Sequence, residues 1–137
     1  MPVEVTPVQV LRCIAAVATN GRRPRPRLCE SVPPVFDPPA GHPASDWELL
    51  RKALEDVVHD STGTAHKSAL AAFDVAGKTG TAQVADGADH AWFAGYGPTA
   101  APRYAFVVLV EHGGLGGAAP PRIAARMIEG FIPHREK

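Results

Sequence analysis

Apolar residues recur at three- and four-residue steps near the start of the chain, the spacing that places them on one face of a helix. Thr6 is a suitable N-cap there, and Gln9 three residues later completes the pattern of a capping box. The stretch predicts a helix over residues 7–20, ended by Asn20-Gly21. The residues expected on its buried face are Val8, Leu11, Ile14, Ala15 and Ala18.

A second helix is predicted over residues 46–59, where Ser45 and Glu48 match another capping box. Its expected apolar face consists of Trp47, Leu50, Leu54, Val57 and Val58. The two helices are separated by residues 21–44, which hold half of the chain's 14 prolines and are expected to be looped or extended. A short edge strand, where proline is tolerated, is predicted within residues 27–35.

The second half of the chain shows the pattern of β-strands. Strands are predicted over residues 73–83, 91–96 and 104–110, joined by short loops that favour antiparallel neighbours. The third is an uninterrupted apolar run rich in β-branched residues, so it is expected to be the most buried. A last helix is predicted over residues 121–131. Its buried side is expected to be marked by Ile123, Met127 and Phe131.

This order of elements predicts an α+β fold, with helices packed on an antiparallel sheet. With 137 residues and 45% hydrophobic content, the chain fits one domain with one core. Its 14 basic and 14 acidic residues leave no net charge, which argues against nucleic-acid binding. The one basic cluster, Arg22 to Arg27, is short and interrupted by proline, and we interpret it as a solvated connection.

The cysteines and histidines show no spacing typical of metal ligands. Cys13 falls in an apolar helical run, where a buried thiol is expected. The alternative is a disulfide between Cys13 and Cys29, which forms only outside the cytoplasm. We interpret His59 and His66 as solvated or hydrogen-bonded histidines. The sequence shows neither a signal pattern nor a transmembrane stretch.

The segment with the clearest chemical character is Lys78-Thr79-Gly80-Thr81, in the first predicted strand. Glycine adds no packing to a strand, so Gly77 and Gly80 suggest that something approaches the backbone closely. The lysine supplies a cation and the threonines supply hydroxyl groups, which suit a carboxylate or an oxyanion. The alternative is a glycine-bearing edge strand with a solvated lysine. His90, in the loop after this strand, is a candidate for the border of a cleft.

Lys-Thr-Gly is a signature of serine acyltransferases that react with penicillin. Around this motif the chain resembles the class B penicillin-binding proteins over nearly its whole length. The matching segments are Val5-Thr6-Pro7-Val8-Gln9, Gly63-Thr64-Ala65, Ala76 to Gln83, His90 to Tyr96 and Glu111-His112-Gly113-Gly114. The resemblance implies the C-terminal part of a transpeptidase domain, with a partial penicillin-binding or serine β-lactamase-like fold.

Two other signatures of that family are not found in this sequence: Ser-x-x-Lys, which carries the nucleophile, and Ser-x-Asn, which helps to relay protons. No serine is followed by lysine three positions on, and Asn20 has no serine two residues before it. Thr64-Ala65-His66-Lys67 imitates the first signature but coincides with the family's Gly-Thr-Ala segment. Because both signatures lie upstream of the first helix in the family, we interpret their absence as truncation.

For the parent family, the resemblance implies peptidoglycan cross-linking at the extracytoplasmic face of the bacterial cell membrane. It implies that Lys78, Thr79 and Thr81 hold the terminal carboxylate of a stem peptide ending in D-Ala-D-Ala, or that of a β-lactam. Gly80 would allow the close approach, and the amide of Thr81 would complete the oxyanion hole. No metal or organic cofactor is implied.

Without the nucleophile, this chain alone is expected to be inactive. Three hypotheses stay open: an inactive piece of such an enzyme, a non-catalytic binding or scaffolding module, and one half of a split enzyme completed by an upstream half. Self-association is also expected, because apolar surface that the upstream half covers in the family would be exposed.

Overall fold

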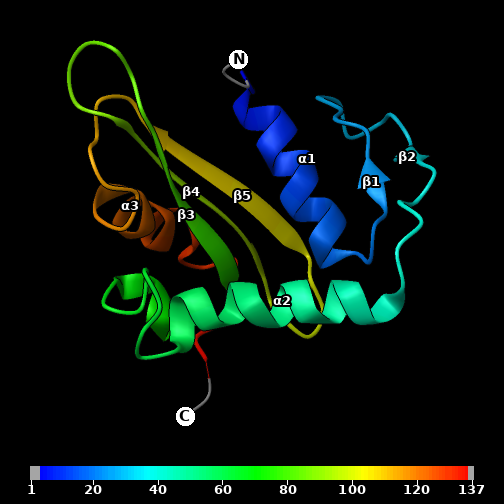
Figure 1. The fold of residues 1–137 in the computed structure, drawn as a ribbon. Coiled ribbons are helices and arrows are strands. Elements are labelled where there is room, and N and C mark those ends of the chain that lie inside the picture. The colour runs from blue at the N-terminus through cyan, green and yellow to red at the C-terminus, as the bar shows by residue number, and fades with distance from the viewer. Residues whose placement is uncertain (1–3, 136–137) are drawn as a thin grey trace.

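The computed structural model describes residues 4–135. In this part of the chain it holds three α-helices, one 3-10 helix and two sheets (Figure 1). The elements are α1 (Pro7–Ala18), β1 (Arg23–Pro24), β2 (Phe36–Asp37), α2 (Ala44–His59), the 3-10 helix η1 (Ala69–Ala72), β3 (Ala76–Ala82), β4 (His90–Gly97), β5 (Tyr104–Val110) and α3 (Ala119–Ile128). Helices pack on an antiparallel sheet, so the predicted α+β class is confirmed.

The main sheet has three strands in the order β3-β4-β5, and both pairings are antiparallel. The prediction that the strand over 104–110 is the most buried is wrong. β4 is buried from Phe93 to Gly97, whereas Tyr104 at the start of β5 is exposed. The middle strand of a meander has a neighbour at each edge, and the short connections place β4 in that position.

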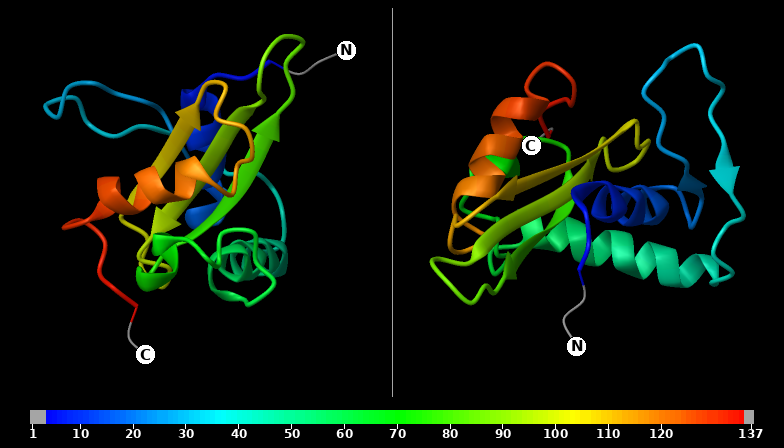
Figure 2. Two further views of the ribbon diagram at one scale, coloured as in Figure 1. Left: turned by 90° about the vertical axis from the view of Figure 1, so that its left-hand side faces the viewer. Right: turned by 90° about the horizontal axis from the view of Figure 1, so that it is seen from above.

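The sheet buries side chains on both faces, with α3 on one side and α1 on the other (Figure 2). The core under α3 includes Phe93, Phe106, Val108, Ala124 and Ile128. The core under α1 includes Ile14, Ala18, Ala76, Ala94 and Tyr96. Helices on both faces also pack against β5, which explains its continuous apolar run although it lies at the edge of the sheet.

The capping box predicted at the start of α1 is confirmed. The Gln9 N–H donates to Thr6 Oγ1 at 3.3 Å, and the Thr6 N–H donates to Gln9 Oε1 at 2.7 Å. On the predicted apolar face, Ile14 and Ala18 are buried, whereas Val8 is 49% exposed. The C-terminal half of the helix thus packs on the sheet, while its first turn remains in contact with solvent.

The capping box predicted for the second helix is not formed. α2 begins at Ala44 with Pro43 in the N-cap position, so Ser45 lies within the first turn. The Ser45 hydroxyl contacts the carboxylate of Asp46 at 3.5 Å. The side chain of the N-cap residue is the one that can accept hydrogen bonds from the N–H groups of the first helical turn. Proline has no acceptor in its side chain, so α2 has no such cap.

α3 turns a different side to the sheet from the one that its sequence predicts. Ile123, Met127 and Phe131 are 47%, 44% and 62% exposed, so the prediction that they are buried is wrong. The buried residues of the helix are Pro120, Pro121, Ala124, Ala125 and Ile128. Both sides of this helix carry apolar residues, and small side chains such as alanine allow the helix to lie close against the sheet.

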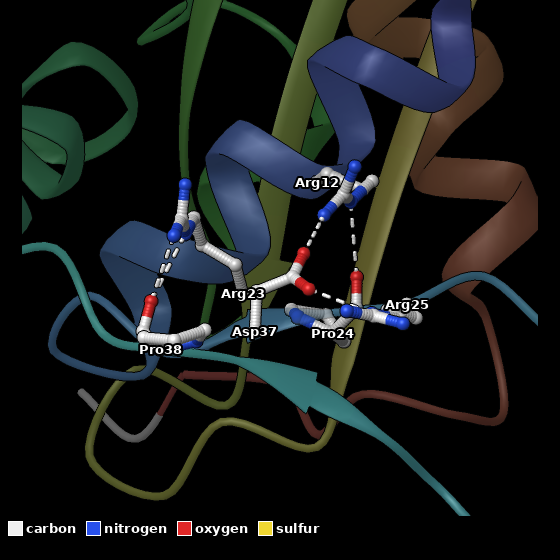
Figure 3. A network of polar contacts seen from close by, with 6 residues as sticks. All are labelled: Arg12, Arg23, Pro24, Arg25, Asp37 and Pro38. Carbon is white, nitrogen blue, oxygen red and sulfur yellow. Dashed lines mark hydrogen bonds and ion pairs between the residues drawn. The ribbon is translucent and has the colours of Figure 1, made fainter.

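Residues 22–38 form an arm beside α1 (Figures 1 and 2). The strand predicted within 27–35 is wrong, because this segment turns back on itself: the Val32 N–H donates to the carbonyl oxygen of Cys29, and Arg27 donates to the carbonyl oxygen of Glu30. β1 and β2 pair at the base of the arm instead. Asp37 anchors this base through ion pairs with Arg12 of α1 and with Arg25, each at 2.6 Å (Figure 3). The hydrogen bond from Arg25, together with both guanidinium charges, lowers the pKa of Asp37. Part of the basic cluster therefore stabilises the fold.

Candidate functional site

The motif strand β3 lies at an edge of the main sheet. It pairs with β4, with Gly80 opposite Trp92, and its other edge has no strand beside it in the described part of the chain. β3 is shorter than the predicted strand 73–83, because Phe73 forms an antiparallel bridge to His134 instead. The backbone of the motif is therefore open along one edge.

The glycines of the motif strand permit close contacts within the protein itself. A Cβ on Gly77 would lie 2.5 Å from the Phe93 ring and 2.6 Å from the carbonyl oxygen of Ala94. A Cβ on Gly80 would lie 3.2 Å from the Cβ of Trp92. The loop before α3 approaches the Gly80 backbone through another glycine, since a Cβ on Gly116 would lie 2.1 Å from the Gly80 carbonyl oxygen. This loop lies directly against the motif strand, and the approach of a ligand to Gly80 stays a prediction.

Each of the two motif threonines is bonded to a different loop. Thr79 Oγ1 lies 2.7 Å from Thr64 Oγ1, and Thr81 Oγ1 accepts a hydrogen bond from the Gly116 N–H at 3.1 Å. Lys78 Nζ donates to the carbonyl oxygen of Thr79 at 2.8 Å. The fold therefore gathers one ammonium group and three hydroxyl groups along the edge of β3.

Thr64 is the site residue that sequence reasoning does not assign. It is 15 residues from Thr79, in the turn that follows α2. Gly63 allows this turn to lie against the helix, since a Cβ there would lie 2.4 Å from the carbonyl oxygens of Asp56 and Val57. The available signal is the Gly-Thr-Ala match itself, which identifies the segment but does not indicate a contact with the motif.

Two cavities share β3 as a wall. The motif cavity, of about 640 Å³, is lined by Thr64, Lys78 to Thr81 and Leu115 to Ala118. The apolar cavity, of about 410 Å³, lies between β3, α1 and α2. Its apolar lining includes Val10, Ile14, Val17, Leu54 and Trp92. Among the described residues, Lys78 is the only charged one that lines either cavity, so the motif offers a single cation at the border of polar and apolar surfaces.

His90, the predicted border residue, lines neither cavity. Its Nδ1 accepts a hydrogen bond from the His112 N–H at 3.0 Å, and the two rings pack edge to face with centroids 4.9 Å apart. This contact joins the start of β4 to the turn after β5. A contact between His90 and a ligand stays a prediction.

The thiols and imidazoles are not grouped for metal binding. Cys13 and Cys29 are free and exposed, and the predicted burial of Cys13 is wrong because its side of α1 faces the apolar cavity. His59 Nε2 bonds the carbonyl oxygen of Val75 at 2.8 Å, and burial lowers the pKa of His59. Within residues 4–135, no three potential metal ligands come together.

No helix in the described part of the chain is long and apolar enough to cross a membrane.

An edge strand with Lys-Thr-Gly, on an antiparallel sheet covered by helices on both faces, is typical of the penicillin-recognising class of proteins, which includes the penicillin-binding proteins and the serine β-lactamases. The family model of the penicillin binding protein transpeptidase domain matches residues 2–129. The chain belongs to this family.

The chain is also similar to curated peptidoglycan D,D-transpeptidases. It is 28% identical to MrdA of Haemophilus influenzae in an alignment of 156 positions that covers 95% of this chain and 24% of that protein. It is 32% identical to MrdA of Acinetobacter baumannii in an alignment of 157 positions that covers 96% of this chain and 23% of that protein. The chain therefore spans about a quarter of the length of these relatives.

Solved structures agree with this assignment. Penicillin-Binding Protein (PBP2) from Helicobacter pylori has a TM-score of 0.79 and 30% identity, over 93% of this chain and 25% of that one. PBP2 of Pseudomonas aeruginosa, in complex with WCK 5153, has a TM-score of 0.74 and 34% identity, over 90% of this chain and 29% of that one. The predicted resemblance to class B penicillin-binding proteins and the partial transpeptidase fold are thus confirmed.

Proposed function

We propose that this chain supplies the carboxylate-binding side of a peptidoglycan transpeptidase site. In this proposal Lys78 Nζ and the hydroxyl groups of Thr79 and Thr81 hold the terminal carboxylate of a stem peptide ending in D-Ala-D-Ala, or that of a β-lactam. The backbone N–H of Thr81 donates to the oxyanion that develops during acyl transfer. The extracytoplasmic face of the bacterial cell membrane is part of the same proposal.

The distribution of charge around β3 is the observation that carries the proposal. Lys78 is exposed and forms no ion pair with any residue in 4–135. Its ammonium group is held beside the Thr79 hydroxyl, 3.4 Å away, at the open edge of the strand. A cation next to hydroxyl donors suits a carboxylate, and membership of the transpeptidase family supports a peptide as its carrier.

The proposal assigns binding to this chain and leaves acyl transfer to groups that it does not contain. The printed sequence has no Ser-x-x-Lys, and a serine nucleophile needs a neighbouring base to be activated. The proposed partner is therefore the portion of a transpeptidase domain that carries the nucleophile. Such a portion would complete the site along the open edge of β3.

Lys78→Met is expected to weaken binding of acetyl-D-Ala-D-Ala about tenfold, because a hydrogen bond to a charged group contributes about 1.5 kcal/mol or more. Binding is measured by titrating the isotope-labelled chain and following amide resonances of β3. The carboxamide analogue of the peptide should bind the unchanged chain as weakly as the peptide binds the variant.

The matched control is Lys52→Met. Lys52 is an exposed lysine that pairs with Asp56 at 2.7 Å and lines neither cavity, so its loss should leave the preference for the carboxylate intact. Equal binding of peptide and carboxamide to the unchanged chain would contradict the proposal. Labelled penicillin should leave the mass of the intact chain unchanged, and a covalent adduct would show that the chain does contain a nucleophile.

Thr64→Val is expected to weaken binding of the same peptide about two- to tenfold. Valine keeps the shape of the side chain but removes the hydroxyl group 2.7 Å from Thr79, and a neutral hydrogen bond contributes about 0.5–1.5 kcal/mol. Thr64→Ser keeps the hydroxyl group and should bind nearly as well as the unchanged chain. If valine and serine variants bind alike, Thr64 does not orient the Thr79 hydroxyl.

A further inference from the structure

A smaller pocket borders the motif cavity on the side of α3. This pocket, of about 360 Å³, shares Thr64, Gly117 and Ala118 with the motif cavity. The shared wall is closely packed, because a Cβ on Gly117 would lie 2.9 Å from the carbonyl oxygen of Thr64. The two cavities are therefore neighbours on either side of the contact between Thr64 and Gly117.

Two cations line this smaller pocket, Lys67 from the turn after α2 and Arg122 from the first turn of α3. We refer to it as the basic pocket. Its lining contains no acidic residue, and the first turn of α3 contains none either. Within residues 4–135 neither cation forms an ion pair, whereas Arg12 and Arg25 share Asp37.

The turn that carries Lys67 is held by its own hydrogen bonds. The Ser68 hydroxyl donates to the carbonyl oxygen of Ala65 at 2.7 Å and accepts from the Leu70 N–H at 3.3 Å. Ser68 is thereby occupied in capping the 3-10 helix η1. The groups left to meet a ligand are the ammonium group of Lys67 and the guanidinium group of Arg122, which together favour an anion.

We propose that the basic pocket is a second anion subsite, which binds a carboxylate located upstream in a peptide whose C-terminal carboxylate is held at Lys78. The inference rests on the proposed function, because it needs the peptide to be anchored in the motif cavity. The planar guanidinium group of Arg122 matches the two oxygens of a carboxylate, and Lys67 adds a second positive charge. The ligand class is thus a peptide with two carboxylates.

The test titrates the 137-residue chain with acetylated peptides that end in D-Ala-D-Ala and carry either Glu or Gln at one, two or three positions before it. At the position from which the side chain reaches the basic pocket, the Glu peptide is expected to bind about two- to fivefold more tightly than its Gln counterpart, since exposed ion pairs are weak in water. Lys67→Gln and Arg122→Gln should each remove this preference and retain the preference for a C-terminal carboxylate over a carboxamide.

Arg126→Gln is the matched control, because Arg126 has the same charge on the same helix but does not line the basic pocket. This variant and Lys67→Arg should keep the preference for Glu. Loss of the preference in Arg126→Gln, or its persistence in both Lys67→Gln and Arg122→Gln, would overturn the subsite. The subsite would also be overturned if acetate occupied the pocket but a carboxylate attached to the peptide did not make the peptide bind more tightly.

The two proposals fail in different ways. If the unchanged chain distinguishes a C-terminal carboxylate from a carboxamide but never Glu from Gln, the second subsite is wrong and the proposed function stands. If the chain makes neither distinction, the proposed function is wrong and the subsite fails with it.

Discussion

Phe93→Ala is expected to lower the free energy of unfolding by about 3–5 kcal/mol, the range for removing a fully buried phenylalanine ring. Phe93 is 0% exposed in the central strand β4, and its ring stacks with that of Phe106 at a centroid distance of 6.1 Å. The same ring fills the space that Gly77 leaves open on β3. Urea denaturation followed by circular dichroism measures the loss, which is a large part of the total stability of about 5–15 kcal/mol typical of a domain.

Phe131→Ala is the matched control for this prediction. Its ring is 62% exposed just after α3, so truncation should cost less than about 1 kcal/mol. If the two variants were equally stable, the core between α3 and the sheet would not be built as described. The same control tests the orientation of α3, because the sequence predicts that Phe131 is buried whereas the structure exposes it. A large loss of stability in Phe131→Ala would favour the orientation that the sequence predicts.

Gly116→Ala is expected to lower the free energy of unfolding by about 1–3 kcal/mol, as overpacking of a tight contact does. The added Cβ would lie 2.1 Å from the carbonyl oxygen of Gly80 and 2.8 Å from its nitrogen, and backbone atoms cannot rotate away. The loop before α3 must then move from β3, which breaks the hydrogen bond between the Gly116 N–H and Thr81 Oγ1. Titration with acetyl-D-Ala-D-Ala should show weaker binding, because this loop lines the motif cavity.

Gly41→Ala provides the comparison. A Cβ on Gly41 meets no atom within 4 Å and its backbone is not in the left-handed region, so stability should stay within about 0.5 kcal/mol. Unchanged stability and unchanged peptide binding in Gly116→Ala would show that the loop does not press on the motif strand. Loss of stability without loss of binding would separate the fold from the site.

Signals that act over a few residues predict this structure well. The capping box of Thr6 and Gln9 forms as its sequence spacing indicates, because both hydrogen bonds lie within one helical turn. The third strand has the predicted bounds 104–110, since an unbroken apolar run rich in β-branched residues is followed by a glycine-rich turn. The Lys-Thr-Gly motif leads to the correct family for the same reason, as it is contiguous.

Predictions about which surface is buried are less successful. The apolar run of β5 is typical of a central strand, but here two helices cover its faces while one edge has no partner strand in the described residues. On α3 both Ile123 and Ile128 suit a core, and the 3.6-residue period cannot rank two apolar sides of one helix. Burial depends on what packs against each side.

By itself, the sequence determined the succession of the three α-helices and the three strands of the main sheet, the antiparallel connection of these strands and the place of Lys78 to Thr81 on one of them, because each follows from residues that are neighbours in the chain. Only the tertiary structure decided which strand is central and which loops meet the motif. Thr64 lies 15 residues from Thr79, and Gly116 lies 35 residues from Thr81. Contacts over such separations form when several elements pack at once, so no local pattern of hydrophobic and polar residues contains them.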